Sequence, residues 1–262
     1  MNRSKETNIP DDYDYDYEKE FFNDLREQLD YDFDDEFEYV SLSTSGDESV
    51  CPICRQFDEK FFLRSEAPKL PLCPNCNCAY MYYRKEDLPE GVVISSKDSF
   101  VLPAECVKSF YVHQRALREI SDINKKIELC EDDLEKLAEL MVPYLAAKFP
   151  APADLACRDL LPEYYMRLGK WCDAERVIKG CIEAKAYYPH DGTKQLADFK
   201  SCYQVAMGVL SYISENPGCL QRDIYKKFPY EGAQKDQLKH FMRYSTQIIK
   251  EKSGSTYKLY VK

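Results

Sequence analysis

Apolar residues recur at helical spacing through the middle of the chain. The clearest stripe, at steps of three and four residues, consists of Leu134, Leu137, Leu140, Met141, Tyr144 and Leu145. This period is typical of an amphipathic helix that packs one face on a core, so residues 104–150 are predicted to be helical. Asp132 or Asp133 is expected to cap the helix, and Pro143 is expected to kink or split its last part.

Two further patterns flank this stretch. Residues 153–186 predict two helices around the turn Leu168-Gly169-Lys170. Nearer the N-terminus, short apolar runs at 61–63, 79–83 and 92–94 are typical of strands.

Residues 202–262 combine helical and strand periods. Three helices are expected, with apolar faces formed by Tyr203, Ala206, Leu210 and Ile213, by Leu220, Ile224 and Phe228, and by Leu238, Phe241 and Met242. Cys219 is expected to open the second of these helices. The whole pattern predicts a mainly α fold with small β elements.

The last of these elements is a predicted β-hairpin. Residues 248–252 and 256–261 form its strands around a Ser-Gly-Ser turn. Tyr257, Leu259 and Val261 alternate and are expected to share one buried face.

Charge is unevenly distributed along the chain. Residues 1–49 hold four Lys/Arg and seventeen Asp/Glu, a net charge of −13, whereas residues 201–262 hold ten and five, a net charge of +5. Such acidic density opposes compaction, so the first segment is expected to be a disordered tail. Its aromatic residues leave a second interpretation open, a segment that binds a basic partner, including the C-terminal part of this chain. A short docking helix in this segment would present Phe21, Phe22, Leu25 and Leu29.

Four of the twelve cysteines form two Cys-x-x-Cys pairs. Cys51 and Cys54 are separated by eighteen residues from Cys73 and Cys76. This spacing is typical of a structural Zn²⁺ site, in which four thiolates surround the ion at about 2.3 Å and leave no open position for catalysis. Cys78 is expected to be a bystander. The alternative, a pair of redox dithiols, is disfavoured because neither pair lies between a strand and a helix of a βαβ unit.

With its flanking strand-like runs, this segment resembles a zinc ribbon over residues 50–83. The resemblance implies a small domain built around the metal. Six other cysteines stand singly in helical patterns and are expected to act as small hydrophobes: Cys106, Cys130, Cys157, Cys172, Cys181 and Cys202. Because no secretory signal is recognisable, an intracellular location, cytoplasmic or nucleoid/nuclear, is expected.

Residues 153–186 resemble a single tetratricopeptide helical hairpin. Tyr164 and Tyr165 precede Gly169, and the second helix carries Trp171 and Ala174. In that family, a small residue near the Ala174 position lets two helices approach closely. A peptide-binding array needs several repeats, so the resemblance implies a way of packing two helices and not peptide binding.

Three helices followed by a hairpin resemble the winged-helix family of helix-turn-helix domains over residues 202–262. In that family the third helix enters the DNA major groove and the wing contacts the backbone. Lys235, Lys239 and Arg243 recur every four residues and form one basic stripe on the third helix, about 234–246. The complete set of candidate DNA contacts on helix and wing is Gln234, Lys235, Lys239, His240, Arg243, Lys250, Lys252 and Lys258.

The sequence therefore predicts a zinc-binding, winged-helix DNA-binding regulator. No motif of a nucleotide-binding loop, a nucleophile elbow or a zinc protease is present, so no enzymatic activity is expected. The expected partners are double-stranded DNA and proteins bound through the tail or the helical region. The alternative is an adaptor whose ribbon, hairpin and winged helix all bind proteins. No stretch approaches the about 20 apolar residues that span a bilayer. The expected parts are a tail at 1–49, a zinc-ribbon-like domain at 50–103, a helical region at 104–200 and a winged helix at 201–262.

Overall fold

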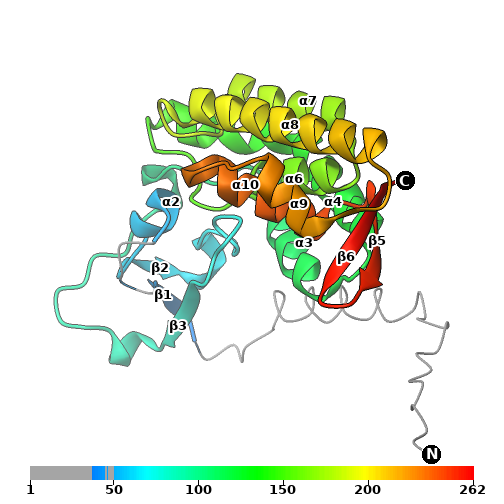
Figure 1. Cartoon of the computed structure of the whole chain (residues 1–262). Coiled ribbons are helices and arrows are strands. Elements are labelled where there is room, and N and C mark those ends of the chain that lie inside the picture. The colour runs from blue at the N-terminus through cyan, green and yellow to red at the C-terminus, as the bar shows by residue number, and fades with distance from the viewer. Residues whose placement is uncertain (1–36, 45, 47–49) are drawn as a thin grey trace, which may run out of the picture.

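The computed structural model describes residues 37–44, 46 and 50–262. Over these residues the chain is mainly helical and carries two small three-stranded sheets (Figure 1). The predicted class, mainly α with small β elements, is confirmed at this level. The predicted docking helix at 21–29 lies outside the described residues. No helix of the described part is both long enough and apolar enough to cross a bilayer.

The first sheet is antiparallel and has the strand order β2-β1-β3. Its strands are β1 Tyr39–Ser43, β2 Phe61–Leu63 and β3 Ala79–Tyr83. The central strand β1 falls inside the segment 1–49, so the prediction of a disordered tail is wrong for these five residues. Val40 and Leu42 are each only 1% exposed. A short apolar alternation thus forms a strand, which the high average charge of the segment conceals.

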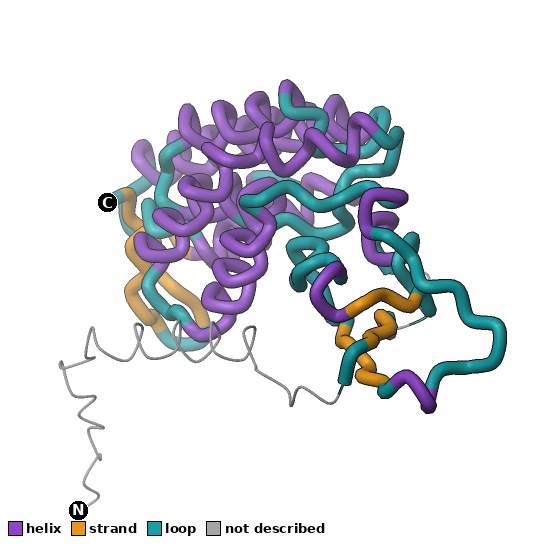
Figure 2. The backbone as a smooth tube through the Cα atoms, turned by 180° about the vertical axis from the view of Figure 1, so that it is seen from behind, coloured by secondary structure: helices purple, strands orange, loops and turns teal. Residues whose placement is uncertain are grey.

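Loops and short helices connect these strands, as the teal tube in Figure 2 shows. Between the strands lie α2 Pro52–Arg55 and the 3₁₀ turn Arg64–Glu66, and two further 3₁₀ turns, Lys85–Asp87 and Lys97–Ser99, follow β3. Phe57 packs against Phe62 and Phe100, with ring centroids 6.1 and 4.8 Å away. The strand predicted at 92–94 is wrong, because only Ile94 forms an isolated bridge, to Phe61. Val93 is 78% exposed and finds no apolar surface to cover it.

The middle of the described chain is built from α3 Val107–Glu119, α4 Ile123–Ala146, α5 Ala156–Asp159, α6 Leu161–Arg167, α7 Trp171–Glu183 and α8 Asp191–Glu215. The single helical stretch predicted at 104–150 is thus two helices. Asp122 caps α4, because its Oδ1 accepts a hydrogen bond from the Asn124 N–H at 2.8 Å. The cap predicted at Asp132 or Asp133 is wrong, since both residues lie within α4.

Pro143 does not end α4, which continues to Ala146. The predicted split is therefore wrong. Proline lacks one N–H donor, and near the C-terminal end of a helix this loss removes a single ladder hydrogen bond. The last turn still closes, because the Ala147 N–H donates to the Pro143 carbonyl at 3.1 Å.

The two helices predicted around residues 168–170 are present as α6 and α7. Gly169 has φ +75° at the turn, the left-handed region that favours glycine. Ala174 is fully buried, in agreement with the predicted need for a small residue there. α7 then runs beside α8 along one side of the molecule (Figure 1).

The C-terminal unit has three helices and a hairpin, in the predicted order. After α8 come β4 Cys219–Leu220, α9 Gln221–Lys227, α10 Gly232–Tyr244, β5 Ile248–Ser253 and β6 Thr256–Val261, with strand order β4-β6-β5. Cys219 lies in β4 and does not open a helix as predicted. Of the predicted buried face, Leu259 is buried, whereas Tyr257 and Val261 are 42% and 40% exposed. The buried residues of the hairpin are instead Ile248, 6% exposed, and Leu259, fully buried.

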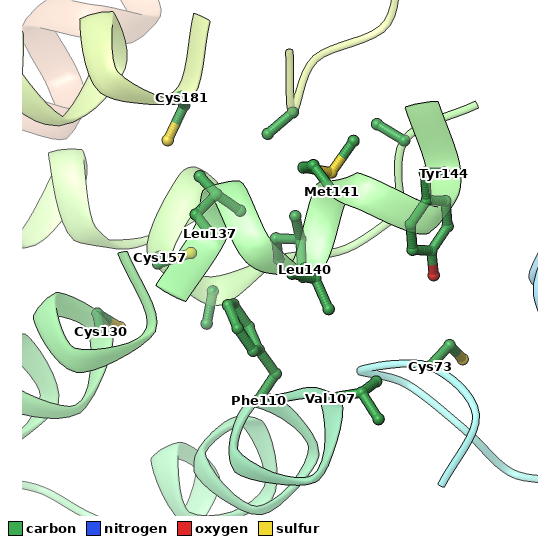
Figure 3. Packing of buried hydrophobic residues seen from close by; sticks show 14 of the residues in the cluster. Cys73, Val107, Phe110, Cys130, Leu137, Leu140, Met141, Tyr144, Cys157 and Cys181 are labelled. Atoms are coloured by element: carbon green, nitrogen blue, oxygen red, sulfur yellow. The ribbon is translucent and has the colours of Figure 1, made fainter. Parts of the chain in front are cut away.

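Two hydrophobic clusters organise the described chain, and α8 contributes to both. Phe199 belongs to the first cluster and Val205 to the second, so the boundary expected at 200/201 falls within one continuous helix. In the first cluster, Cys130, Cys157 and Cys181 pack as small apolar side chains around α4 (Figure 3). Cys172 is exposed, contrary to expectation. All twelve cysteines, each of which the structure describes, are unpaired.

Candidate metal centre and nucleic-acid surface

Two turns carry the predicted metal ligands. Cys51 immediately precedes α2 and Cys54 lies within it, and the backbone closes this turn through the Arg55 N–H and the Cys51 carbonyl at 2.9 Å. Cys73 and Cys76 lie in the loop before β3, where the Cys76 N–H donates to the Cys73 carbonyl at 3.1 Å. Each pair of thiols is thus held on one side of a hydrogen-bonded turn.

The two turns meet in the folded chain. The sulfur atoms of Cys51, Cys54 and Cys73 all lie within 4.8 Å of one another, and Cys54 and Cys73 are 3.5 Å apart. Tetrahedral bonds of 2.3 Å place neighbouring sulfurs about 3.8 Å apart, so the observed spacing suits a metal ion. Cys76 joins the group through Cys54. The four predicted ligands therefore lie in one place and could hold a metal ion.

A fifth thiol belongs to the same place. The sulfur atoms of Cys54, Cys76 and Cys78 also lie within 4.8 Å of one another, so Cys78, expected to be a bystander, stands among the candidate ligands. Cys78 immediately precedes β3 and stands two residues after Cys76. The Cys-x-x-Cys-x-Cys spacing carries this signal. We call Cys51, Cys54, Cys73, Cys76 and Cys78 the cysteine group.

The cysteine group is largely shielded from solvent. Cys54, Cys73 and Cys76 are at most 4% exposed, whereas Cys51 and Cys78 are half-buried. Hydrogen bonds from Cys54 and Cys73 lower the pKa of Cys51 to about 3. The same hydrogen bond between Cys51 and Cys54 raises the pKa of Cys54. The lowered pKa of Cys51 favours its thiolate form, which is the form that binds metals.

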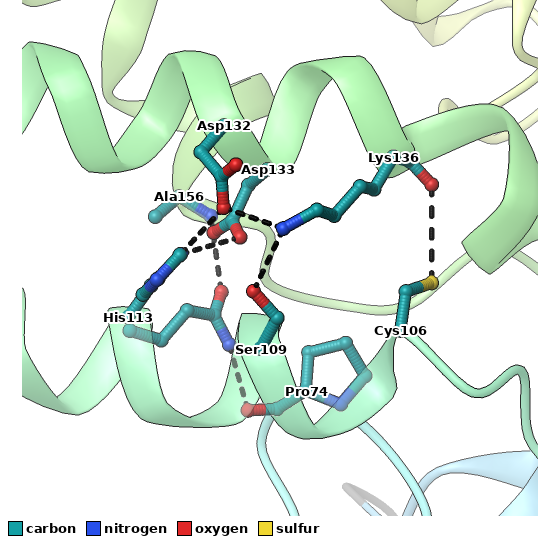
Figure 4. A network of polar contacts seen from close by, with 9 residues as sticks. Pro74, Cys106, Ser109, His113, Asp132, Asp133, Lys136 and Ala156 are labelled. Atoms are coloured by element: carbon teal, nitrogen blue, oxygen red, sulfur yellow. Dashed lines mark hydrogen bonds and ion pairs between the residues drawn. The ribbon is translucent and has the colours of Figure 1, made fainter. Parts of the chain in front are cut away.

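Helix α3 anchors the second turn of the group. Gln114 donates from Nε2 to the Pro74 carbonyl at 2.8 Å and accepts on Oε1 from the Ala156 N–H at 3.0 Å (Figure 4). Arg115 donates to the Cys76 carbonyl at 3.3 Å and lies 3.7 Å from the centre of the Tyr111 ring. The turn is thereby fixed to the helical region.

A cavity of about 450 Å³ opens beside the cysteine group. All five thiols of the group line the cavity, together with Arg55, Arg115 and Arg118. Guanidinium groups at this position offset the negative charge that several thiolates would accumulate.

A separate polar group joins α3 to α4. His113 Nδ1 lies 2.8 Å from Asp133 Oδ1, and Lys136 Nζ lies 2.7 Å from Asp132 Oδ2 (Figure 4). Asp133 is fully buried, which raises its pKa. Sequence reasoning found no acid partner for a histidine, because these residues meet only when the two helices pack. The carboxylates of Asp133 and Asp132 are already paired with His113 and Lys136. We therefore interpret these four residues as a structural contact between α3 and α4.

The basic stripe of α10, whose residues recur every four positions, is exposed to solvent. Lys235, Lys239 and Arg243 face solvent, while Leu238 and Met242 on the adjoining face of the helix are each 1% exposed. We call these three cationic residues the basic face of α10. Lys239 has a neighbouring carboxylate, since its Nζ lies 3.3 Å from Asp236 Oδ1.

The two residues expected beside this stripe differ in their surroundings. Gln234 is exposed near the start of α10. His240 instead turns toward the helical region, with Nε2 3.2 Å from Glu163 Oε1 on α6. Its ring also lies 4.7 Å from that of Tyr244. His240 therefore contacts other residues of the chain, Glu163 and Tyr244. The contact with Glu163 could not be predicted from the sequence of α10 alone.

The wing lysines lie on two different faces of the hairpin. Lys250 pairs with Leu259, and Lys252 lies two residues further on the same face of β5. The Lys250 Nζ donates to the Arg243 carbonyl at 3.2 Å, and burial lowers the pKa of Lys250. Lys258 pairs with Glu251 on the other face. Lys252 is therefore an exposed cation on the same hairpin face as Lys250, Lys250 contacts the end of α10, and Lys258 lies on the other face of the hairpin.

No protein-family model matches the chain, and neither the curated proteins nor the solved structures contain a significant match to it.

Proposed function

We propose that this chain is a non-enzymatic, metal-binding regulator that contacts double-stranded DNA through a winged helix at 201–262. The observation that carries the proposal is the basic face of α10, which is exposed on a helix whose other side is anchored in a core. In this proposal α10 is the helix that enters the major groove, and the β5–β6 hairpin is the wing.

The position of Lys252 supports this assignment. It lies on the same hairpin face as Lys250, whose ammonium group contacts the last turn of α10. A duplex lying along the basic face of α10 would therefore also meet the hairpin at Lys252. Cations spaced in this way neutralise phosphates and release bound counterions, which favours association at low salt.

We further propose that the cysteine group binds Zn²⁺ and that residues 50–83 act as a zinc ribbon. Thiolates are the ligands that zinc prefers in structural sites, and a shell of four sulfurs leaves no position for a reacting water. The role of the ion is then to hold α2, the second turn and the β2-β1-β3 sheet together. The pKa of Cys51, lowered by its sulfur neighbours, supports a site that is ready to bind a cation.

The decisive experiment measures duplex binding by the full chain as a function of salt. Replacing Lys235, Lys239 and Arg243 together with Ala should weaken binding at least roughly tenfold at 0.1 M salt and reduce the slope of log K against log salt by about 2.7. The matched control replaces Lys69, Lys85 and Lys97, three exposed lysines on the sheet side of the chain, and should leave both quantities near wild type. Equal behaviour of the two triple variants would contradict DNA contact by α10.

A second candidate function is a protein adaptor. It is favoured by apolar side chains exposed on the C-terminal unit, where Tyr225, Ile249 and Tyr257 are 39%, 45% and 42% exposed. The contact of His240 with α6 also occupies one flank of the helix that would read DNA. Recovery of a protein partner after nuclease treatment, together with no duplex binding at low salt, would favour the adaptor.

A further inference from the structure

The cysteine group holds one more sulfur than a tetrahedral ion can bind. The two close trios are Cys51, Cys54 and Cys73, and Cys54, Cys76 and Cys78. Cys54 belongs to both, so it is the common point of the five thiols. A zinc ion placed beside Cys54 would find three of its four positions filled by Cys54 and two sulfurs of the first trio. The fourth position then lies between two candidates, Cys76 and Cys78.

These two candidates differ in their access to solvent. Cys76 is 4% exposed, whereas Cys78 is half-buried. Both line the cavity of about 450 Å³ beside the group, so neither is separated from the other by packed side chains. The sulfur atoms of Cys76 and Cys78 both lie within 4.8 Å of that of Cys54, so a small movement of this segment would exchange one for the other.

We propose that Cys78 is an alternative fourth ligand, and that Cys76 and Cys78 exchange at one position of the bound metal ion. This inference rests on the metal-binding part of the proposed function. Zinc can expand from four to five ligands for a short time, so the incoming thiolate binds before the outgoing one leaves. The departing sulfur takes up the proton that the incoming thiol released. The result is a site that keeps four thiolates while it exchanges its metal faster than a closed four-cysteine site.

The first test uses Co²⁺ as the probe metal and the full chain, because the intensity of the cobalt–thiolate charge-transfer band counts the bound sulfurs. Cys76→Ser should still bind one ion through four thiolates, with an affinity within about tenfold of wild type. Cys76→Ser/Cys78→Ser should show three thiolates and lose at least about a hundredfold in affinity, more than the loss of an outer-shell partner costs. Cys172→Ser, which removes an exposed thiol on α7, is the matched control and should equal wild type.

The second test measures the rate at which bound metal exchanges with free metal in Cys78→Ser. This variant keeps Cys51, Cys54, Cys73 and Cys76, so its affinity should be close to wild type while its exchange is at least several-fold slower. Identical cobalt spectra for Cys76→Ser and the double variant, or unchanged exchange in Cys78→Ser, would overturn the role of Cys78 and leave the metal site standing. Absence of cobalt and zinc binding by the wild-type chain would instead overturn the metal site itself.

Discussion

The phenol oxygen of Tyr144 lies 3.2 Å from the Cys51 sulfur and so connects α4 to the cysteine group. Burial raises the pKa of Tyr144, whereas hydrogen bonds from neighbouring thiols lower the pKa of Cys51 to about 3. These opposite shifts favour a hydrogen bond that the Tyr144 phenol donates to the Cys51 sulfur. Hydrogen bonds to a ligand atom fix its orientation and tune its affinity for a metal.

Replacing Tyr144 with Phe removes this donor and keeps the ring that fills the core. We expect about tenfold weaker zinc affinity, measured by competition with a chromophoric chelator. Tyr164→Phe is the matched control, because it deletes a hydroxyl from a buried ring on α6, outside the cysteine group. Equal losses in both variants would mean that the hydroxyl acts only through general stability.

Arg158 should be important for stability, because it is only 6% exposed and its guanidinium forms hydrogen bonds with several acceptors. It donates to the carbonyls of Pro152 and Ala186, each at 2.8 Å, and pairs with Asp159 at 2.7 Å. Arg158→Met keeps much of the side-chain volume and leaves these acceptors unpaired. We expect a loss of about 3 kcal/mol in the free energy of unfolding.

The loss at Arg158 is measured by urea denaturation followed by circular dichroism. Arg176→Met is the control, since Arg176 is 50% exposed and pairs with Glu131 on the surface. That variant should cost less than about 1 kcal/mol. A similar small cost for Arg158→Met would show that the carbonyls regain partners from water.

Asp133 should make stability depend on pH. Burial raises its pKa in the folded chain above the unfolded value of about 4. The folded state then binds a proton more tightly than the unfolded state. The stabilising contribution is complete below about pH 4 and is lost as pH rises through the folded pKa.

The pH effect is tested with Asp133→Asn, which cannot titrate. The groups that face this position are His113 from α3 and Asp132 and Lys136 from α4, and all three remain in the variant. The difference in unfolding free energy, wild type minus variant, should fall as pH rises above about 4. A difference that is flat from pH 4 to 8 would contradict the expectation.

The acidic N-terminal segment should weaken binding to polyanions. Residues 1–36 contain four Lys/Arg and fourteen Asp/Glu, a net charge of −10, whereas residues 201–262 carry +5. Deleting 1–36 keeps the strand β1 and removes this charge. Duplex affinity should rise severalfold at low salt, measured by fluorescence anisotropy, and the gain should shrink at high salt. Equal affinity with and without the segment would exclude this electrostatic competition.

Local periodicity was sufficient to predict most of the secondary structure. The apolar stripe around Leu137 and the turn at Gly169 placed helices where α4, α6 and α7 lie. The order of three helices and a hairpin over residues 202–262 follows from the same reasoning, although the first helix begins earlier, at Asp191. The Cys-x-x-Cys spacing also identified thiols that the fold brings together, because each pair belongs to one short turn.

The features that sequence reasoning missed depend on tertiary contacts. β1 is stable only between two partner strands, and its five residues are outweighed by the acidic composition around them. The orientation of His240 depends on Glu163, which is far away in the sequence. Lys258 and Lys252 lie on opposite faces of the hairpin because of the register in which the two strands pair. A shift of one residue in this register would change which side chains share a face, and the apolar pattern alone does not fix it.

Helix α8 has a mechanical consequence. Its 25 residues form a continuous helix about 37 Å long that contributes to the first hydrophobic cluster and contacts strand β6 of the hairpin. Tilting the C-terminal unit relative to the rest would require breaking backbone hydrogen bonds near residue 200, where no glycine or proline weakens the helix. Because α8 contacts both α10 and α7, a displacement of α10 by a bound partner would also displace α7. The C-terminal unit and the helical region before it should therefore move together.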